Sequence, residues 1–393
     1  MHNPLQVLKH YWGYDGFRPG QAEVIDSILS GHDTLALMPT GGGKSITFQV
    51  PALANPGICL VVSPLVALMK DQVKNLQKRG ILSAFISSEM PHWEILQQLD
   101  NCILGDYKFL YISPERISSE LFQEKLKTLS RKVNLLVVDE AHCISQWGND
   151  FRRDYRLIAD IRDAIPHVQV IAVTASATAA VVADICEQLH FRKGYRIFKT
   201  SFERKNLSFV VRKTDNKLKE ICHILSAVPG SAVIYSRTRK GVEEYAGKLR
   251  AAGISAEYFH AGLEPVLKTE RQADWVKGFT RVLVATNAFG MGIDKGDVRV
   301  VIHTEFPDSM EAYYQEAGRA GRDGKRAYAV ALLGPQDITD IKRRPSNAFP
   351  TIEYIKRVYE ALCNRFQIAE GDGEGVSVYL DEPEFLRDWH LDR

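Results

Sequence analysis

The sequence has few cysteines, and they are not spaced for metal binding or for a disulfide framework. Six Cys are scattered over 393 residues and none forms a C-x-x-C pair, so no zinc site is indicated. We expect reduced, buried thiols, as in cytosolic proteins. The chain also lacks a signal-peptide apolar region and any apolar run of membrane-spanning length. These absences predict a cytoplasmic protein without zinc and without a membrane partner.

The sequence also has little excess charge. Its formal net charge is +2, so a nucleic-acid-binding surface would have to be a local patch. Hydrophobic residues make up 45% and charged residues 25%, which is ordinary for a globular protein. The length allows two or three domains at about 100–200 residues each.

A glycine-rich stretch, residues 38–45, follows the short apolar run Thr34–Leu37. Consecutive glycines let the backbone curl so that several N–H groups point at one phosphate, at the N-terminus of a helix that starts near Lys44. Lys44 would then reach the β- and γ-phosphates, and the Ser45 hydroxyl would hold Mg²⁺. Met38 stands where the common pattern has Gly, so this is a variant loop, and a plain turn is the alternative. The predicted phosphate-binding residues are Thr40, Gly41, Gly42, Gly43, Lys44 and Ser45.

Short apolar runs alternate with helical patterns along most of the chain, which predicts βαβ units and parallel sheets. One series of runs ends near residue 173 and a second begins near residue 232, with a basic segment, Arg192–Lys213, as the predicted junction. The predicted first-series strands are Thr34–Leu37, Ile58–Val62, Phe109–Ile112, Leu135–Val138 and Val168–Val173. The predicted second-series strands are Ala232–Tyr235, Ala256–Phe259, Val282–Ala285, Val300–His303 and Tyr328–Leu333.

The pattern changes after Pro335. Lys342-Arg343-Arg344-Pro345 interrupts it, and Ile352–Phe366 reads as one amphipathic helix. We therefore expect lobes at 1–200 and 201–338, followed by an accessory segment at 339–393 that lacks a zinc module and looks like the start of a further unit.

Two acids, Asp139 and Glu140, follow the apolar run 135–138. Parallel sheets place their active sites at the carboxyl ends of strands, where Asp139 suits Mg²⁺ and Glu140 suits an attacking water. The alternative is that the pair only caps a helix.

Asp139-Glu140-Ala141-His142 resembles motif II of superfamily 2 helicases, and residues 143–148 are similar to the aromatic-rich loop of RecQ-family DNA helicases. Further blocks follow in that family's order: Phe17–Gln21, Ser63–Gln72, Ser113–Arg116, Thr174–Thr178, Tyr258–Leu263, Ala285–Asp294 and Gln315–Gly324. The resemblance covers about residues 10 to 335. It implies the fold class α/β, with two tandem RecA-like parallel-sheet lobes and a short, mainly helical C-terminal segment.

The resemblance also assigns roles around ATP. Tyr14 stands where the family's stacking aromatic lies, and Gln21 can both donate to and accept from one edge of adenine while Arg18 backs the base. Arg319 and Arg322 are three residues apart, so on a helix they share a face and could act as arginine fingers; solvated surface arginines are the alternative. Gln315 opens the same block. The predicted catalytic residues are Lys44, Asp139, Glu140, Arg319 and Arg322, and the predicted cofactors are ATP and Mg²⁺.

Aromatic and basic residues suggest where nucleic acid would bind, because aromatics stack on bases and arginines neutralise phosphates. Asn149 stands where the family usually has His, within a loop predicted to couple DNA to ATP. Trp147 could equally be a core residue. The predicted nucleic-acid-binding or coupling residues are Trp147, Asn149, Phe151, Arg152, Thr174, Arg237 and Thr286.

The prediction is an ATP-dependent DNA helicase that moves 3′→5′ on single-stranded DNA and unwinds partly duplex DNA, in repair or recombination and in association with a bacterial nucleoid. Two rivals remain open: an ATP-driven translocase that does not separate strands, and a nucleic-acid-binding module with an inactive ATPase. An unrelated P-loop kinase would not explain the second lobe. The sequence leaves the oligomeric state open.

Overall fold

The structure is a computed structural model that describes residues 3–39, 41–145, 152–175, 177–201, 203–289, 295–348, 350–369, 372–375 and 377–391, without the side chains of 343–348. Four predicted site residues, Thr40, Trp147, Asn149 and Phe151, lie outside these ranges. So do residues 290–294, within one of the blocks predicted in the second lobe.

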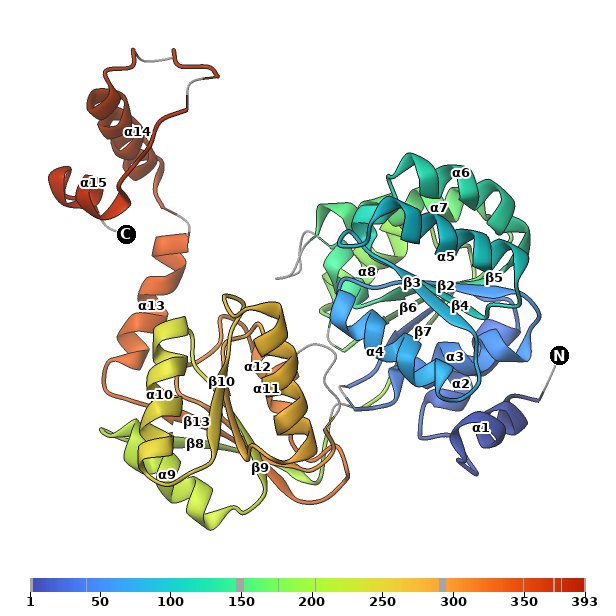
Figure 1. Ribbon diagram of the computed structural model, residues 1–393, viewed down its shortest axis with the longest axis horizontal. Helices are drawn as coiled ribbons and strands as arrows, with labels where there is room; N and C mark the ends of the chain where they lie inside the picture. The colour runs from blue at the N-terminus through green and yellow to red at the C-terminus, as the bar shows by residue number, and fades with distance from the viewer. Residues whose placement is uncertain are drawn as a thin grey trace.

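The first lobe is built on a sheet of seven parallel strands in the order β3-β4-β2-β5-β6-β1-β7 (Figure 1). Its central strands are continuous apolar runs because helices cover both faces. The strands are β1 Thr34–Leu37, β2 Ile58–Val62, β3 Ser83–Ile86, β4 Phe109–Ile112, β5 Val133–Asp139, β6 Val170–Thr174 and β7 Arg196–Lys199.

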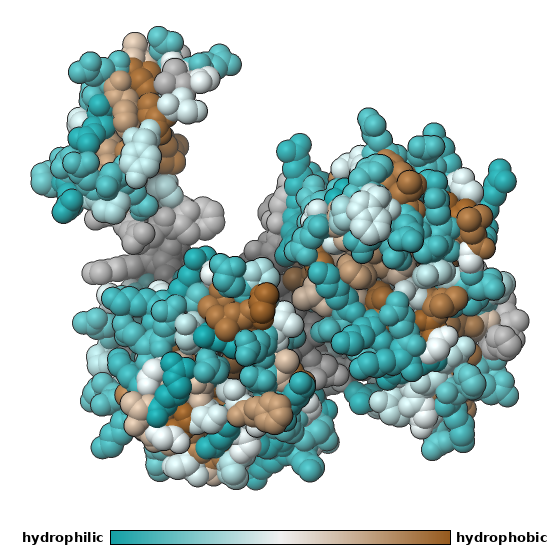
Figure 2. Space-filling view, in the orientation of Figure 1, coloured by the Kyte–Doolittle hydropathy of each residue, from teal (hydrophilic) through white to brown (hydrophobic). Residues whose placement is uncertain are grey.

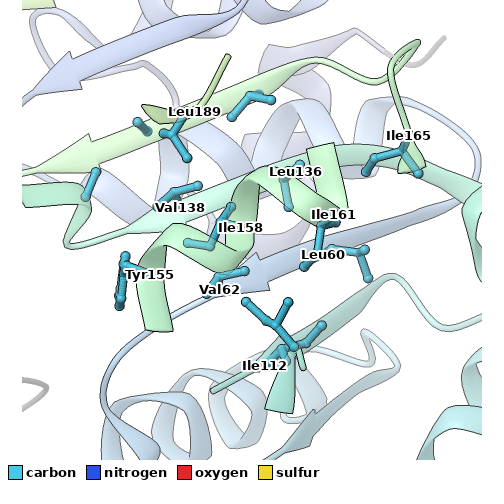
Figure 3. Packing of buried hydrophobic residues seen from close by; sticks show 14 of the residues in the cluster. Leu60, Val62, Ile112, Leu136, Val138, Tyr155, Ile158, Ile161, Ile165 and Leu189 are labelled. Atoms are coloured by element: carbon cyan, nitrogen blue, oxygen red, sulfur yellow. The ribbon is translucent and has the colours of Figure 1, made fainter. Parts of the chain in front are cut away.

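Alternate residues of each strand enter different cores, one on each face of this sheet. Leu35 and Leu37 pack in one core, and Ala36 and Met38 in the other. The helices that share the first core are α5 His92–Leu104, α6 Glu120–Leu129, α7 Ile158–Ala164 and α8 Ala179–Gln188. Those that share the second are α1 Pro4–Trp12, α2 Gln21–Leu29, α3 Lys44–Ala54 and α4 Val66–Gln77. Figure 3 shows Ile158 and Ile161 of α7 lying over Val62, Leu60 and Leu136 of the sheet.

The second lobe repeats this plan with a sheet of six parallel strands in the order β10-β11-β9-β12-β13-β8. Its strands are β8 Leu207–Lys213, β9 Ser231–Tyr235, β10 Ala256–Phe259, β11 Val282–Ala285, β12 Val298–His303 and β13 Ala327–Leu333. Its helices are α9 Lys217–Ala227, α10 Arg239–Ala251, α11 Pro265–Lys277 and α12 Met310–Ala317. The predicted fold class of two parallel α/β lobes is confirmed.

The C-terminal segment is helical and stands beyond the second lobe (Figure 1). Helix α13 Asp337–Ala348 leads away from that lobe, and α14 Ile352–Phe366 packs with α15 Glu382–Asp388 around a small core of Ala361, Phe385 and Leu391. Figure 2 shows apolar side chains at the surface of this segment. No helix in the described part of the chain is both long and apolar enough to cross a membrane.

The structure differs from the sequence expectation at the junction and in α13. Within Arg192–Lys213 the chain forms two edge strands, β7 and β8, so that only residues 200–206 join the two sheets. Edge strands are exposed on one side and lack the apolar run of a central strand, which is why the pattern did not indicate them. Strand β3 is another edge strand that was missed; it is largely buried, but it is only four residues long and begins with a polar serine. Helix α13 continues through Pro345, where we expected the pattern to break.

A buried ion cluster closes the end of the first sheet opposite the strand ends that carry Lys44 and Asp139. Asp33, whose side chain is fully buried, accepts hydrogen bonds from Arg162 Nη2 at 3.0 Å and Arg192 Nη2 at 2.9 Å. The same carboxylate accepts from the backbone N–H of Val170 at 2.9 Å and of Arg192 at 2.8 Å. It therefore links the start of β1 to α7, β6 and the approach to β7.

We expect Asp33→Ala to lower the free energy of unfolding of the first lobe by roughly 3–5 kcal/mol, because it leaves the buried Arg162 guanidinium without its counter-charge. The matched control is Asp163→Ala, which removes an exposed carboxylate paired with His190 and should cost at most about 1 kcal/mol. Urea unfolding, with hydrogen exchange of the β1 amides to report on the first lobe, measures both. Equal losses in the two variants would contradict the role of the cluster.

Candidate functional site

A cleft of about 1010 Å³ lies between the two lobes, at the carboxyl ends of β1 and β5. It is lined from both sides, so neither lobe makes it alone. The structure brings these predicted residues to its walls: Tyr14, Arg18, Gln21, Gly41, Gly43, Lys44, Ser45, Asp139, Glu140, Gln315, Arg319 and Arg322. Its size is that of a small-molecule site rather than of a nucleic-acid groove.

The glycine loop has the geometry of a phosphate cradle. Gly41 and Gly43 have φ angles of 79° and 78°, in the left-handed region that glycine adopts without strain. A Cβ on Gly43 would lie 2.4 Å from Gln21 Nε2, so the position also lacks room for a side chain. Helix α3 begins at Lys44, directly after the loop, and the positive end of its dipole therefore faces the cleft.

Lys44 and the acidic pair converge on this cradle. Lys44 Nζ is buried, has no hydrogen-bond partner among the residues that the structure describes, and lies 3.5 Å from Glu140 Oε1. Glu140 Oε2 lies 3.5 Å from His142 Nδ1, and that nitrogen is 2.9 Å from Thr174 Oγ1. A chain of polar contacts thus runs from the glycine loop through β5 to the end of β6.

The charge on Asp139 depends on what else the cleft contains. Burial, followed by the neighbouring Glu140 carboxylate, raises the pKa of Asp139 to about 6, while the Lys44 charge opposes the shift. A buried carboxylate of this kind is stabilised in its ionised form by a cation. Because Ser45 and Asp139 line the same cleft, the donor set fits a hard, oxygen-preferring divalent ion such as Mg²⁺.

The predicted adenine residues contact the glycine loop from outside the cradle. Arg18 Nη1 donates to Gly41 O at 2.7 Å, and Gln21 Nε2 donates to Gly43 O at 3.1 Å. Gln21 Oε1 accepts from the backbone N–H of Arg18 at 2.8 Å. Both side chains therefore brace the phosphate loop here, and Gln21 would have to exchange these partners to read a base. Tyr14 is half exposed at the mouth of the cleft.

The second lobe contributes its arginines from the end of α12 and the turn after it. A Cβ placed on Gly41 would lie 3.3 Å from Arg322 Cγ, so Arg322 packs directly on the glycine loop of the other lobe. Arg319 is largely buried and lies beside the phenol of Tyr235, which donates to Phe289 O at 2.9 Å. Tyr235 is a buried neighbour of Arg319 that sequence reasoning missed, since it reads as one more apolar position of β9.

Four predicted nucleic-acid residues are described: Thr174, Arg237 and Thr286 lie at or just after strand ends, and Arg152 precedes a short 3-10 turn. Arg152 Nη1 donates to Pro64 O at 3.1 Å, and Thr174 bonds His142. In the second lobe, Arg237 pairs with Asp308, and Thr286 is buried just after β11. These side chains are thus buried or bonded to neighbouring residues, and they do not form one exposed surface patch.

The predicted coupling loop is anchored at the acidic pair. The Arg152 N–H donates to Cys143 O at 2.8 Å, which joins the two described ends of the segment. Tyr155 is fully buried and its hydroxyl donates to Asp139 O at 2.9 Å. Tyr155 was missed because nothing in its local sequence points back to Asp139.

Two family signatures match the chain: "DEAD/DEAH box helicase" over residues 18–185 and "Helicase conserved C-terminal domain" over residues 216–324. A protein of Bacillus subtilis (strain 168) named "ATP-dependent DNA helicase RecQ" is 43% identical over 341 residues, which are 86% of this chain and 57% of that protein. A second protein of that strain, "Probable ATP-dependent DNA helicase RecS", is 40% identical over 84% of this chain and 67% of its own length.

Among solved structures, S. cerevisiae Dbp5 bound to RNA and ADP BeF3 has a similar fold, with a TM-score of 0.68 and 19% identity over 88% of this chain and 92% of that one. The likeness confirms the RecA-like pair of lobes. The chain spans little more than half the length of the RecQ relatives that it matches.

We expect Gly43→Ala to weaken binding of a fluorescent nucleoside triphosphate at least about tenfold, since the new Cβ would meet Gln21 and the left-handed backbone would be strained. The matched control is Gly80→Ala, which imposes a similar backbone strain at φ 76° with nothing within 4 Å of the new Cβ. Fluorescence titration measures both variants. Equal affinity of the Gly43 variant and the parent would contradict the cradle.

Proposed function

Because the chain belongs to the RecQ family of superfamily 2 helicases, we propose that it is an ATP-dependent DNA helicase that moves 3′→5′ on single-stranded DNA and separates duplex strands. One observation carries this proposal. One cleft is lined by Lys44 and Glu140 of the first lobe and by Arg319 and Arg322 of the second. A ligand bound there would therefore contact both lobes.

The proposed hydrolytic step uses side chains that are already close. Lys44 would leave Glu140 and neutralise the β- and γ-phosphates, and the freed Glu140 carboxylate would orient the attacking water and accept its proton. Arg319 and Arg322 would stabilise the charge that develops on the γ-phosphoryl oxygens. Because these arginines belong to the other lobe, cleavage of the γ-phosphate would release the lobes from one another.

Mg²⁺ would be held by Ser45 and Asp139, and it would supply positive charge that neutralises the phosphate oxygens. The residues fit this role on one observation of the chain itself, the buried Asp139 carboxyl whose pKa is raised by burial and by the neighbouring Glu140 carboxylate. A bound cation would favour the ionised form of Asp139.

Single-stranded DNA would lie across the two lobes, beside Arg152 and the strand ends that carry Thr174, Arg237 and Thr286. The supporting observation is the anchored loop. It begins just after Glu140 and its exit is tied to Asp139 by Tyr155, so a shift at its tip would reach the acidic pair. The stacking and coupling roles of Trp147, Asn149 and Phe151 stay predictions, as do the nucleoid location, a role in repair or recombination, and the lack of zinc.

The function is tested by strand displacement on a duplex with a 3′ single-stranded tail, alongside ATP turnover with and without single-stranded DNA. A helicase displaces the strand with ATP and is stimulated by DNA. DNA-stimulated turnover without displacement would favour a translocase, and no turnover at all would favour a binding module with an inactive ATPase.

In the same assays, we expect Lys44→Ala to reduce ATP turnover to background while leaving single-stranded DNA affinity near that of the parent. The variant removes the charge that neutralises phosphate, and the proposed DNA residues lie elsewhere. Lys127→Ala, which removes an exposed lysine of α6 that does not line the cleft, is the control and should retain turnover. Hydrolysis by the Lys44 variant at the rate of the parent would contradict the proposal that Lys44 is required for ATP hydrolysis.

Gln21→Ala tests base recognition separately from phosphate binding. We expect it to weaken ATP binding more than GTP binding by roughly tenfold, the value of two hydrogen bonds at about 0.5–1.5 kcal/mol each. Part of the loss should affect both nucleotides, because Gln21 also braces Gly43. Glu23→Ala, an exposed position on the same helix, is the control. An equal loss for ATP and GTP would mean that Gln21 only supports the loop.

A further inference from the structure

The connection between the lobes is bonded to both sides of the cleft, by Thr200 at its start and by Arg204 and Asn206 toward its end. At its start, the Thr200 N–H and hydroxyl both donate to Leu37 O, at 3.0 and 3.2 Å, just before the glycine loop. The Thr200 methyl group fills the space beside Gly20, where a Cβ would lie 2.2 Å away. Gly20 directly precedes Gln21, so this end of the segment touches the predicted adenine motif.

At the other end, Arg204 is bonded to the turn that carries the arginine fingers. Arg204 Nη1 donates to Gly318 O at 2.8 Å, and Nη2 donates to Ala320 O at 2.8 Å and Gly321 O at 2.5 Å. These carbonyl groups flank Arg319 and lie just before Arg322. They also follow the end of α12, where backbone carbonyls lack helical partners and carry partial negative charge.

Asn206 completes the attachment. Its Nδ2 donates to Gly321 O at 2.7 Å and to Lys325 O at 2.9 Å, and its carbonyl accepts from the Ala327 N–H at 2.9 Å. Gly321 has a φ of 63°, and a Cβ there would lie 2.6 Å from Asn206 Nδ2. Glycine at 321 is thus required by the close approach of the segment as well as by its own backbone conformation.

The planar fork of Arg204 suits this task better than a point charge would. A guanidinium can satisfy three carbonyl oxygens at fixed angles, whereas a lysine ammonium on a flexible stem would hold fewer of them in less defined geometry. Because Arg319 lies between two of the bonded carbonyls, the direction in which its side chain leaves the backbone depends on Arg204. None of the contacts of Arg204 reaches the ligand space of the cleft, since it is not among the residues that line it.

We propose that Arg204 is a positioning residue that fixes Arg319 and Arg322 for contact with the γ-phosphate. The inference rests on the proposed function only in taking the ligand to be a nucleoside triphosphate. A purely structural helix cap would stabilise the lobe without distinguishing a triphosphate from a diphosphate.

The test compares the dissociation constants of AMP-PNP and ADP, both with Mg²⁺ and without DNA, for the parent, Arg204→Ala, Arg319→Ala and the double variant. We expect Arg204→Ala to weaken AMP-PNP binding at least about tenfold relative to ADP, the scale of one lost hydrogen bond to a charged group. Arg319→Ala should have a similar effect, and the double variant should lose little more than either single variant because the two residues act in series.

Two further variants keep the test decisive. Arg204→Lys retains the charge and part of the bonding, so it should fold and lose an intermediate share of the preference. Arg212→Ala, which removes an arginine of β8 paired with Glu220, is the control and should leave the preference unchanged.

Three outcomes would overturn the inference: an unchanged AMP-PNP to ADP ratio in both Arg204 variants, an equal loss for both nucleotides with a lower melting temperature, or fully multiplicative losses in the double variant. Failure of the premise taken from the proposed function, that the cleft binds a nucleoside triphosphate, looks different, because the parent itself would then bind neither nucleotide.

Discussion

The cleft depends on a stretch of backbone that only glycine can form. Gly41 and Gly43 both adopt positive φ, and the space beside each is already taken, by Arg322 at one and Gln21 at the other. Arg18 and Gln21 bond the carbonyl groups of this stretch, and helix α3 begins at its end. Arg18 and Gln21 of the first lobe and Arg322 of the second therefore all contact the glycine loop. They can approach its backbone this closely because glycine has no side chain.

Electrostatics ties the rest of the first lobe to that cradle. A buried lysine, two neighbouring carboxylates and a histidine lie close together between α3 and β6, and burial makes the charge on Asp139 depend on its neighbours. The raised pKa of Asp139 is the clearest sign of this dependence. Binding of a triphosphate with its cation would change these contacts, because the Lys44 ammonium cannot pair closely with both the Glu140 carboxylate and a phosphate.

The two lobes are coupled by few but specific contacts. The packing of Arg322 on Gly41 is direct. In the connection between the lobes, Thr200 bonds Leu37 of the first lobe and Arg204 bonds the turn at 318–321 of the second. The helical segment beyond α13 stands outside this arrangement (Figure 1).

The sequence by itself determined the elements whose signals are local. Continuous apolar runs identified the central strands, because strands covered on both faces need apolar residues at every position, and the glycine loop and Asp139-Glu140 marked the carboxyl ends of β1 and β5. Only the tertiary structure decided the rest. Edge strands β7 and β8 carry no such run, and the contacts of Arg204, Tyr155 and Tyr235 join residues far apart in the chain. Periodicity reports which face of an element is buried, but not which distant carbonyl group an arginine or a tyrosine will meet there.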